Sequence, residues 1–294
     1  MRKLIFTILV LVTILKLNAQ LVDVQADYNA MGDCVFTAYN NTLAPVFLNI
    51  KFADLENTTF SEPLPYVKKL SPGFNNLFTL LRDQEADVPR FHYEIKVFRS
   101  NPIAKVDLQF PYLIPFEEGK HVKYFDVKEI DGFWGSEGLE SWLAVGFYAQ
   151  PGDDVYATRN GEVVEIVGEK RTGNSELWYH TWTNSVTLLQ ADGTLVCYHN
   201  VTISEKELKI GDMVYAGQKF AKISNGSDNL KLLIYHRSLF ADGLLFVVPE
   251  FVTDENGKHS ILNASADYKV NHPYDIRALE MSKKELKKIL GKRK

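Results

Sequence analysis

The chain has 294 residues, of which 46% are hydrophobic, and its formal net charge is −4 at pH 7. This length is sufficient for two domains that each bury a core. The near balance of 33 basic and 37 acidic residues argues against a nucleic-acid partner, because nucleic-acid-binding proteins usually present a basic face. The sequence contains only two cysteines, Cys34 and Cys197. A disulfide framework is therefore excluded, and we expect two buried free thiols.

Residues 1–19 (MRKLIFTILVLVTILKLNA) have the pattern of a secretory signal peptide, with Arg2 and Lys3 ahead of an apolar run. The uninterrupted apolar run from Leu4 to Leu15 has about 12 residues, against the roughly 20 that a membrane-spanning helix needs. The sequence therefore predicts cleavage and export, to the periplasm or the extracellular space. No later segment is apolar for long enough to cross a bilayer, so we expect no transmembrane span after cleavage.

Residues 20–110 alternate short β-type runs with turn clusters. The runs are CVFTAYN, VFLNIKF and FHYEIKVF, and the turns include Asn40-Asn41 and Ser71-Pro72-Gly73. Runs of period 2 at this spacing predict a small antiparallel β-sandwich. This part of the sequence contains neither a titratable cluster nor a glycine-rich loop. It is therefore typical of a structural or docking module.

Residues 111–275 are predicted to form a second domain that is also antiparallel β. The segment LQFPYLIPFEEG, at residues 108–119, is rich in proline and aromatic residues and predicts an extended connector lying against this domain. Asn160-Gly161 and Asp192-Gly193 are strong turn dipeptides between apolar flanks. Helix is expected only in the tail, residues 276–294, where Ser282 and Glu285 form a capping box that opens a short basic helix. The predicted class is all-β with minor helix.

Three phrases in the second half occur together and in a fixed order. They are GDDVYATRNGEVVEI at 152–166, NSVTLLQADGTLVCYHN at 184–200 and IGDMVYAGQKFAKISNG at 210–226. This series resembles the lysostaphin/LytM-type zinc endopeptidases, peptidase family M23. The resemblance implies an antiparallel β domain of the duplicated hybrid motif type. It also implies a zinc ion held by an H-x-x-x-D block and an H-x-H block, which activates water against a peptide bond of peptidoglycan.

The first zinc-binding block of the family is degenerate in this sequence. Its aspartate position falls on Gly146 and its histidine position on Trp142, or on Phe147 and Leu143 if the register slips by one residue. None of these side chains offers a lone pair to zinc. The resemblance therefore predicts that this half of the metal site is lost.

The other zinc-binding block is also replaced. The two histidines of H-x-H fall on Asn229 and Lys231, or on Leu230 and Leu232 after a one-residue slip. We prefer the first register, because it leaves both leucines on the apolar face of the strand. A lysine ammonium at this position would repel a divalent cation. In the middle block Gln190 stands at one histidine position of the family.

A single family histidine remains, since His199 fits the Y-x-H-L motif as a vestigial catalytic residue. The predicted protein is an exported, non-catalytic relative of the family without a cofactor, which binds a cell-wall peptide or a partner envelope protein. An active zinc metalloendopeptidase with relocated ligands, for which His236 is a candidate, and a purely structural envelope protein are the alternatives. His272 is expected in a C-terminal turn. The residues expected to line a binding groove are His180, Trp178, Trp182 and Gln190.

Overall fold

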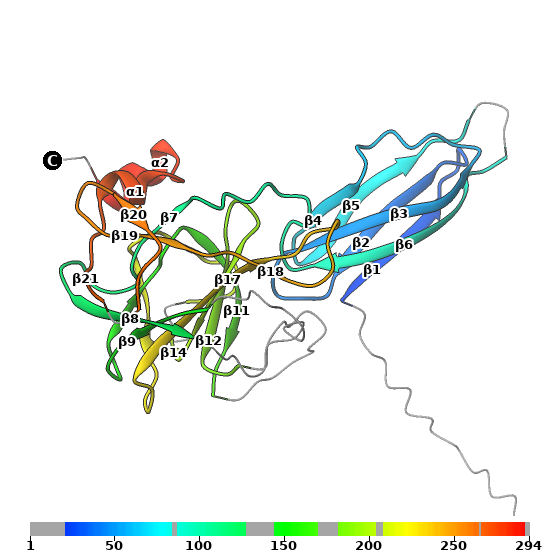
Figure 1. Cartoon of the computed structure of the whole chain (residues 1–294). Helices are drawn as coiled ribbons and strands as arrows, with labels where there is room; N and C mark the ends of the chain where they lie inside the picture. The colour runs from blue at the N-terminus through cyan, green and yellow to red at the C-terminus, as the bar shows by residue number, and fades with distance from the viewer. Residues whose placement is uncertain are drawn as a thin grey trace, which may run out of the picture.

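The structure is a computed structural model that describes residues 21–83, 87–127, 144–169, 182–203, 208–264 and 266–291. The described chain is almost entirely antiparallel β, which confirms the predicted class. In Figure 1 a blue-to-cyan sandwich formed by the N-terminal strands lies beside a larger green-to-orange β body, against which the red C-terminal helices pack. Among the described residues no helix is long and apolar enough to cross a membrane.

The N-terminal sandwich consists of two three-stranded antiparallel sheets. Phe36 lies between them, with its ring stacked on Phe78 at 4.6 Å between centroids and edge-on to Tyr93 at 5.5 Å. Inward side chains alternate with more exposed ones along the strands Cys34–Asn40 and Arg90–Phe98, as a two-layer sandwich requires. One sheet has the order β1 (Val22–Tyr28), β2 (Cys34–Asn40), β5 (Gly73–Leu80), and the other β4 (Tyr66–Leu70), β3 (Val46–Glu56), β6 (Arg90–Phe98).

A nine-stranded sheet organises the second half of the chain. At its centre β17 (Asn229–His236) lies between β13 (Leu195–His199) and β9 (Ala144–Tyr148), which are both distant from it in sequence. Its order is β15 (Met213–Val214), β11 (Gly161–Val167), β12 (Ser185–Leu189), β13 (Leu195–His199), β17 (Asn229–His236), β9 (Ala144–Tyr148), β8 (His121–Val127), β21 (Asp267–Lys269), with β18 (Leu245–Phe246) paired to β17.

Two smaller sheets and the C-terminal helices complete this half. Strand β7 (Pro111–Tyr112) pairs in parallel with β19 (Glu250–Val252). The predicted connector therefore contributes a strand to a sheet of the second half of the chain. The sheets are β10 (Asp154–Tyr156), β16 (Lys219–Ile223), β14 (Val201–Thr202), and β20 (His259–Ser260), β19 (Glu250–Val252), β7 (Pro111–Tyr112). The helices are α1 (Tyr274–Ala278), α2 (Lys283–Glu285) and the π-helical turn η1 (Leu286–Leu290). Ser282 and Glu285 form the predicted capping box at α2.

The two faces of the large sheet differ in character. On one face, Leu230, Leu232 and Ile234 of β17 join the main core, which also contains the buried connector residues Tyr112 and Ile114. The opposite face carries the other residues of the same strands. Toward one end it is apolar, around Leu195, Leu233 and Tyr235. At the other end it bears polar side chains, and these form the candidate site described below.

The sandwich and the second half of the chain contact each other through charged side chains. Arg99, just after β6, donates to the Val164 carbonyl at 3.1 Å and lies 3.8 Å from Glu165. Lys69 of β4 pairs with Glu162 of β11 at 2.9 Å. The first contact is buried and the second half-exposed, so they differ in how strongly they hold the two parts together.

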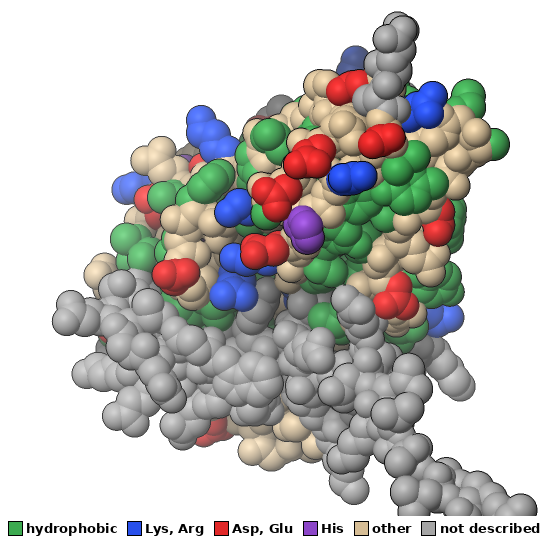
Figure 2. All heavy atoms as spheres, turned by 90° about the vertical axis from the view of Figure 1, so that its right-hand side faces the viewer, with side chains coloured by type: hydrophobic (Ala, Val, Ile, Leu, Met, Phe, Trp, Pro, Cys, Tyr) green, Lys and Arg blue, Asp and Glu red, His purple; other side chains and the backbone are tan. Residues whose placement is uncertain are grey.

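The turn and cysteine predictions have mixed outcomes. Asp192-Gly193 closes the β12–β13 hairpin, with Gly193 at a φ of 82°. Asn160-Gly161 lies between strands of different sheets, and Gly161 is already the first residue of β11, so the predicted turn is not formed at this pair. Cys34 and Cys197 are both buried, as predicted, and neither forms a disulfide in the described structure. On the face seen in Figure 2, acidic and basic side chains are interspersed around hydrophobic ones, so neither sign dominates there.

Candidate functional site

Five residues from five adjacent strands form a straight row across the large sheet. The strand register pairs Phe125 with Gly146, Gly146 with Lys231, Lys231 with His199, and His199 with Ser185. Directly paired residues of antiparallel strands project to the same face, so these five share one surface. We name this set the His199 row. It brings together two positions that the resemblance assigned to zinc ligands, Gly146 and Lys231, and the vestigial catalytic residue His199.

At one end of the row, the ring of Phe125 covers Gly146. A Cβ atom built on Gly146 would collide with three ring carbons of Phe125. The ring also contacts the ring of Tyr148, at 4.7 Å between centroids. The space that a side chain at position 146 would occupy is therefore filled by an aromatic ring from the neighbouring strand. The sequence gives no signal for this, because β8 and β9 meet only in the folded sheet.

His199 lies at the end of β13 against an aromatic partner. Its ring stacks on that of Trp182, with centroids 4.2 Å apart and the ring planes 17° from parallel. Trp182 is only 9% exposed, so it supports the imidazole from beneath and offers little surface of its own. Trp182, an expected groove residue, thus meets His199, and the stack fixes the orientation of the imidazole.

Asn229 continues the same face two residues from Lys231, at the polar end of β17. Its Oδ1 accepts a hydrogen bond from Asn200 Nδ2 at 2.8 Å, and its own Nδ2 donates to Asp228 at 2.6 Å. Asn200 adopts a positive φ of 69°, which an asparagine tolerates better than most residues. The amide of Asn229 therefore braces the turn after His199.

The residues present in the row do not fit a zinc ion. Zinc in proteins is held by nitrogen, sulfur or carboxylate ligands at about 2.0–2.3 Å. Gly146 has no donor, Phe125 occupies its side-chain space, and Lys231 brings a cation where the resemblance implies a neutral histidine. His199 is the only ring nitrogen in the row. Across the described part of the chain, no group of three or more His, Cys, Asp and Glu residues could hold a metal ion.

Gln190 lies apart from the His199 row. It follows β12 at the end opposite Ser185, five residues and about 17 Å away at 3.3 Å per residue. It is 3% exposed, and its Oε1 accepts hydrogen bonds from Thr194 Oγ1 at 2.6 Å and from the Tyr112 hydroxyl at 3.1 Å. The structure thus places this expected groove residue in a buried polar network.

Arg159 is the centre of that network. Its guanidinium donates to Glu280 with distances from 2.6 to 3.0 Å and to Asp192 at 2.9 Å. It also stacks on the ring of Phe110, with Cζ 3.6 Å from the centroid. Burial alone would raise the pKa of Asp192. The charge of Arg159 and hydrogen bonds from Thr194 and Arg159 outweigh burial, and the pKa falls below its ordinary value of 3.8.

Two further histidines of the sequence hypothesis, His236 and His272, lie outside the row. His236 ends β17 five residues from Lys231 and pairs with Leu245 of β18. His272 is buried just before α1, with Nε2 3.1 Å from the Ile114 carbonyl oxygen. Trp142, Trp178 and His180, and the segment 1–19, lie outside the described residues.

The sequence matches no known family profile and no curated protein. Among solved structures the chain is similar to lysostaphin, at 21% identity and a TM-score of 0.29, and it spans about half of that chain (48%) with 42% of its own residues. It is also similar to the catalytic domain of lysostaphin from Staphylococcus simulans, at 20% identity and a TM-score of 0.29, covering 45% of this chain and 88% of that one. Against Csd3 from Helicobacter pylori the identity is 12%, the TM-score 0.30, and the coverage 89% and 57%. At such values the likeness is one of fold, and it assigns no role to any residue.

Proposed function

We propose that the protein is an exported, non-catalytic relative of the lysostaphin/LytM-type endopeptidases, and that it binds a cell-wall peptide through the face that carries the His199 row. The observation that carries this proposal is the Phe125 ring over Gly146, beside the cation of Lys231. A position that would have to supply a metal-binding carboxylate has neither a donor nor room for one. Without a bound metal, the imidazole of His199 has no activated water to use, since bulk water is far too weak an acid to lose its proton near neutral pH.

The same face keeps features that suit an extended peptide. Lys231 offers a cation to a peptide carboxylate, and Tyr148, which is 56% exposed, offers an aromatic surface beside it. The stacked pair of Trp182 and His199 holds a polar edge in a fixed orientation. Recognition by such groups needs no chemical step, so a peptide-binding face can persist after the loss of a metal site.

Two measurements on the purified protein test the absence of catalysis. We expect no stoichiometric zinc by elemental analysis after incubation with zinc and removal of the excess, and no release of muropeptides from peptidoglycan. Stoichiometric zinc together with muropeptide release, both abolished in His199→Ala, would establish the alternative of an active endopeptidase with relocated ligands.

A sedimentation assay with insoluble peptidoglycan tests the binding. We expect the protein to sediment with peptidoglycan and Lys231→Glu to bind at least about fivefold more weakly, because the substitution reverses the charge that meets the peptide carboxylate. Lys269→Glu is the matched control, since Lys269 lies on β21 outside the row. Binding of an envelope protein instead of peptidoglycan would redirect the proposal to a protein partner, and binding of neither would favour a purely structural role.

A further inference from the structure

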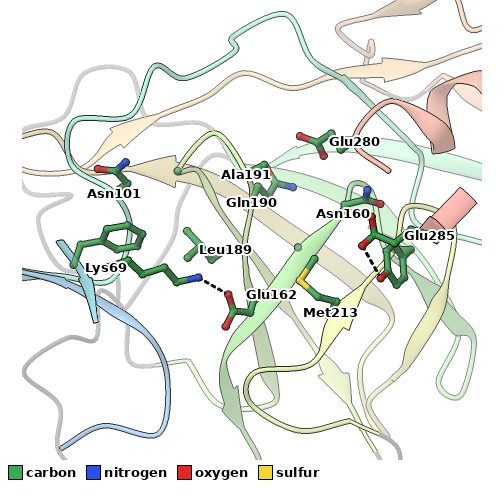
Figure 3. Close-up of a pocket in the computed structure, with 14 residues that line it drawn as sticks. Lys69, Asn101, Asn160, Glu162, Leu189, Gln190, Ala191, Met213, Glu280 and Glu285 are labelled. Carbon is green, nitrogen blue, oxygen red and sulfur yellow. Dashed lines mark hydrogen bonds and ion pairs between the residues drawn. The ribbon is translucent and has the colours of Figure 1, made fainter. Parts of the chain in front are cut away.

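A cavity of about 340 Å³ lies where three parts of the chain meet. Lys69 reaches it from the sandwich, the β12–β13 turn closes one side, and Glu280 and Glu285 border it from the C-terminal segment (Figure 3). Its volume falls within the range of small-molecule sites, about 300–1,000 Å³. The cavity is at the opposite end of β12 from His199, so it is separate from the His199 row.

Two side-chain amides on the cavity wall have their oxygens engaged and their NH₂ groups available. Gln190 Oε1 is held by Thr194 and Tyr112, while Gln190 Nε2 is buried and has no hydrogen-bond partner among the described residues. Asn160 Oδ1 accepts from the Ala216 backbone N–H at 2.7 Å, and its Nδ2 donates to no other described residue. A buried donor without an acceptor is costly, so these amides favour a ligand that brings carbonyl oxygens.

The charge of the cavity is negative. Glu162, Glu280 and Glu285 line it, and Asp192 lies directly behind it. Among the described residues, only two cations pair with these four carboxylates: Lys69 pairs with Glu162, and Arg159 serves both Glu280 and Asp192. Two negative charges are therefore left without a cation, which favours a positively charged ligand.

Glu285 is the carboxylate best placed to meet such a ligand. It accepts hydrogen bonds from the Tyr215 hydroxyl at 3.0 Å and from the Ser282 backbone N–H at 2.8 Å, and no cation pairs with it in the described structure. Hydrogen bonds from Ser282 and from Tyr215 lower the pKa of Glu285 below its ordinary value of 4.5. It therefore carries its charge at neutral pH.

We infer that this cavity binds a short peptide with a free ammonium group, whose charge meets Glu285 and whose carbonyl oxygens accept from Gln190 and Asn160. Met213, 46% exposed on the edge strand β15, and the buried Leu189 give the same cavity an apolar wall for a small side chain. The assignment concerns a site of its own and does not rest on the function proposed for the His199 row.

The first test uses one pair of synthetic probes in calorimetric titration of the full chain at low salt. Alanyl-alanine amide carries a free ammonium and two carbonyl groups, whereas N-acetyl-alanyl-alanine amide has no charge and carries an added acetyl group. We expect saturable binding of the free amine, at least about fivefold weaker binding of the acetylated peptide, and weakening of the free amine's binding at about 0.5 M salt. Equal affinities for the two probes, or no saturable binding of the free amine, would overturn the assignment.

Variants then locate the site. Glu285→Gln removes the charge, while a glutamine still suits the capping box. Met213→Arg places a cation in the cavity from an exposed position and should fold normally. We expect each to weaken binding of alanyl-alanine amide by about fivefold or more, and Glu255→Gln, an 80% exposed carboxylate elsewhere, to leave it unchanged. Lys231→Glu should also leave it unchanged, which separates this site from the His199 row. Wild-type affinity in both cavity variants would exclude the cavity as the binding site.

Discussion

The Phe125 ring lies on the Cα of Gly146, across the β8–β9 pair. Glycine is therefore required at position 146 by the aromatic ring above it, even though the residue sits in a regular strand. The ring of Phe125, from β8, occupies the space that a side chain at position 146 of β9 would fill. A side chain added at position 146 should therefore destabilise the protein.

Gly146→Ala should lower the free energy of unfolding by about 1–3 kcal/mol, because the new methyl group displaces the Phe125 ring. In a Phe125→Ala background the same substitution should cost little, so a double-mutant cycle by urea unfolding should give a coupling of about 1 kcal/mol or more. Gly168→Ala is the control, because a Cβ there meets no atom of the described residues within 4 Å. Additive effects of the two substitutions would contradict the contact.

Arg159 should be among the most sensitive residues of the described chain. Its side chain is 2% exposed and compensates Asp192 and Glu280, which are themselves largely buried. Arg159→Met should cost about 3–5 kcal/mol, since it leaves two buried carboxylates without their cation. Arg159→Lys should recover only part of the loss, because an ammonium cannot reproduce the planar fork of hydrogen bonds. Chemical denaturation measures both, and a loss below about 1 kcal/mol for the methionine variant would contradict the network.

The two charged contacts between the sandwich and the second half should differ in strength. Arg99→Met removes a buried hydrogen bond to Val164 and leaves Glu165, whose side chain is 7% exposed, without this cation. We expect a loss of about 3 kcal/mol. Lys69→Met breaks an ion pair whose lysine is 48% exposed, and we expect less than about 1 kcal/mol. Thermal and urea unfolding measure both variants, and each serves as the control for the other. A larger loss of stability in Lys69→Met than in Arg99→Met would show that burial does not decide the strength of these contacts.

His272 should make stability depend on pH. Burial lowers its pKa below the ordinary value of 6.5, more than the hydrogen bond to the Ile114 carbonyl raises it. The unfolded chain therefore takes up a proton at a higher pH than the folded chain. Its contribution to stability is fully present above about pH 6.5 and is lost as the pH falls through the lowered folded-state pKa.

We expect the difference in unfolding free energy between pH 7.5 and pH 5 to shrink in His272→Gln, whose amide can still donate to the Ile114 carbonyl. His92→Gln is the control, because the His92 side chain is 83% exposed. If His272→Gln and the wild type lose the same unfolding free energy between pH 7.5 and pH 5, His272 is not the group that makes stability depend on pH.

Local patterns in the sequence were sufficient to predict many strands. CVFTAYN coincides with β2, and FHYEIKVF and NLKLLIYH lie within β6 and β17, because alternation over these lengths reports directly which face is buried. The capping box at Ser282 was predictable for the same reason, since it is a contact between residues three apart.

Contacts between distant strands could not be predicted in this way. Asn160-Gly161 has the composition of a hairpin turn, yet the strand before it pairs with β16 and the strand after it with β12 and β15. Phe125 and Gly146 meet only through the register of β8 and β9. Gln190 was expected in a groove because it stands at a histidine position of the family motif, but it lies past the end of β12 and its side chain joins the network around Arg159. In each case the contact depends on which strands pair in the folded sheet. A local sequence pattern carries no information about that pairing.

The salt bridge from Arg159 to Glu280 also bears on how far the chain can be shortened. Glu280 lies between α1 and α2 and belongs to a segment that resembles a dispensable basic tail. A protease that removed this segment would take away one of the two carboxylates compensating an arginine in the protein interior, and with it Glu285 at the cavity. The C-terminal helices are thus an integral part of the β body, and trimming them should unfold it in part.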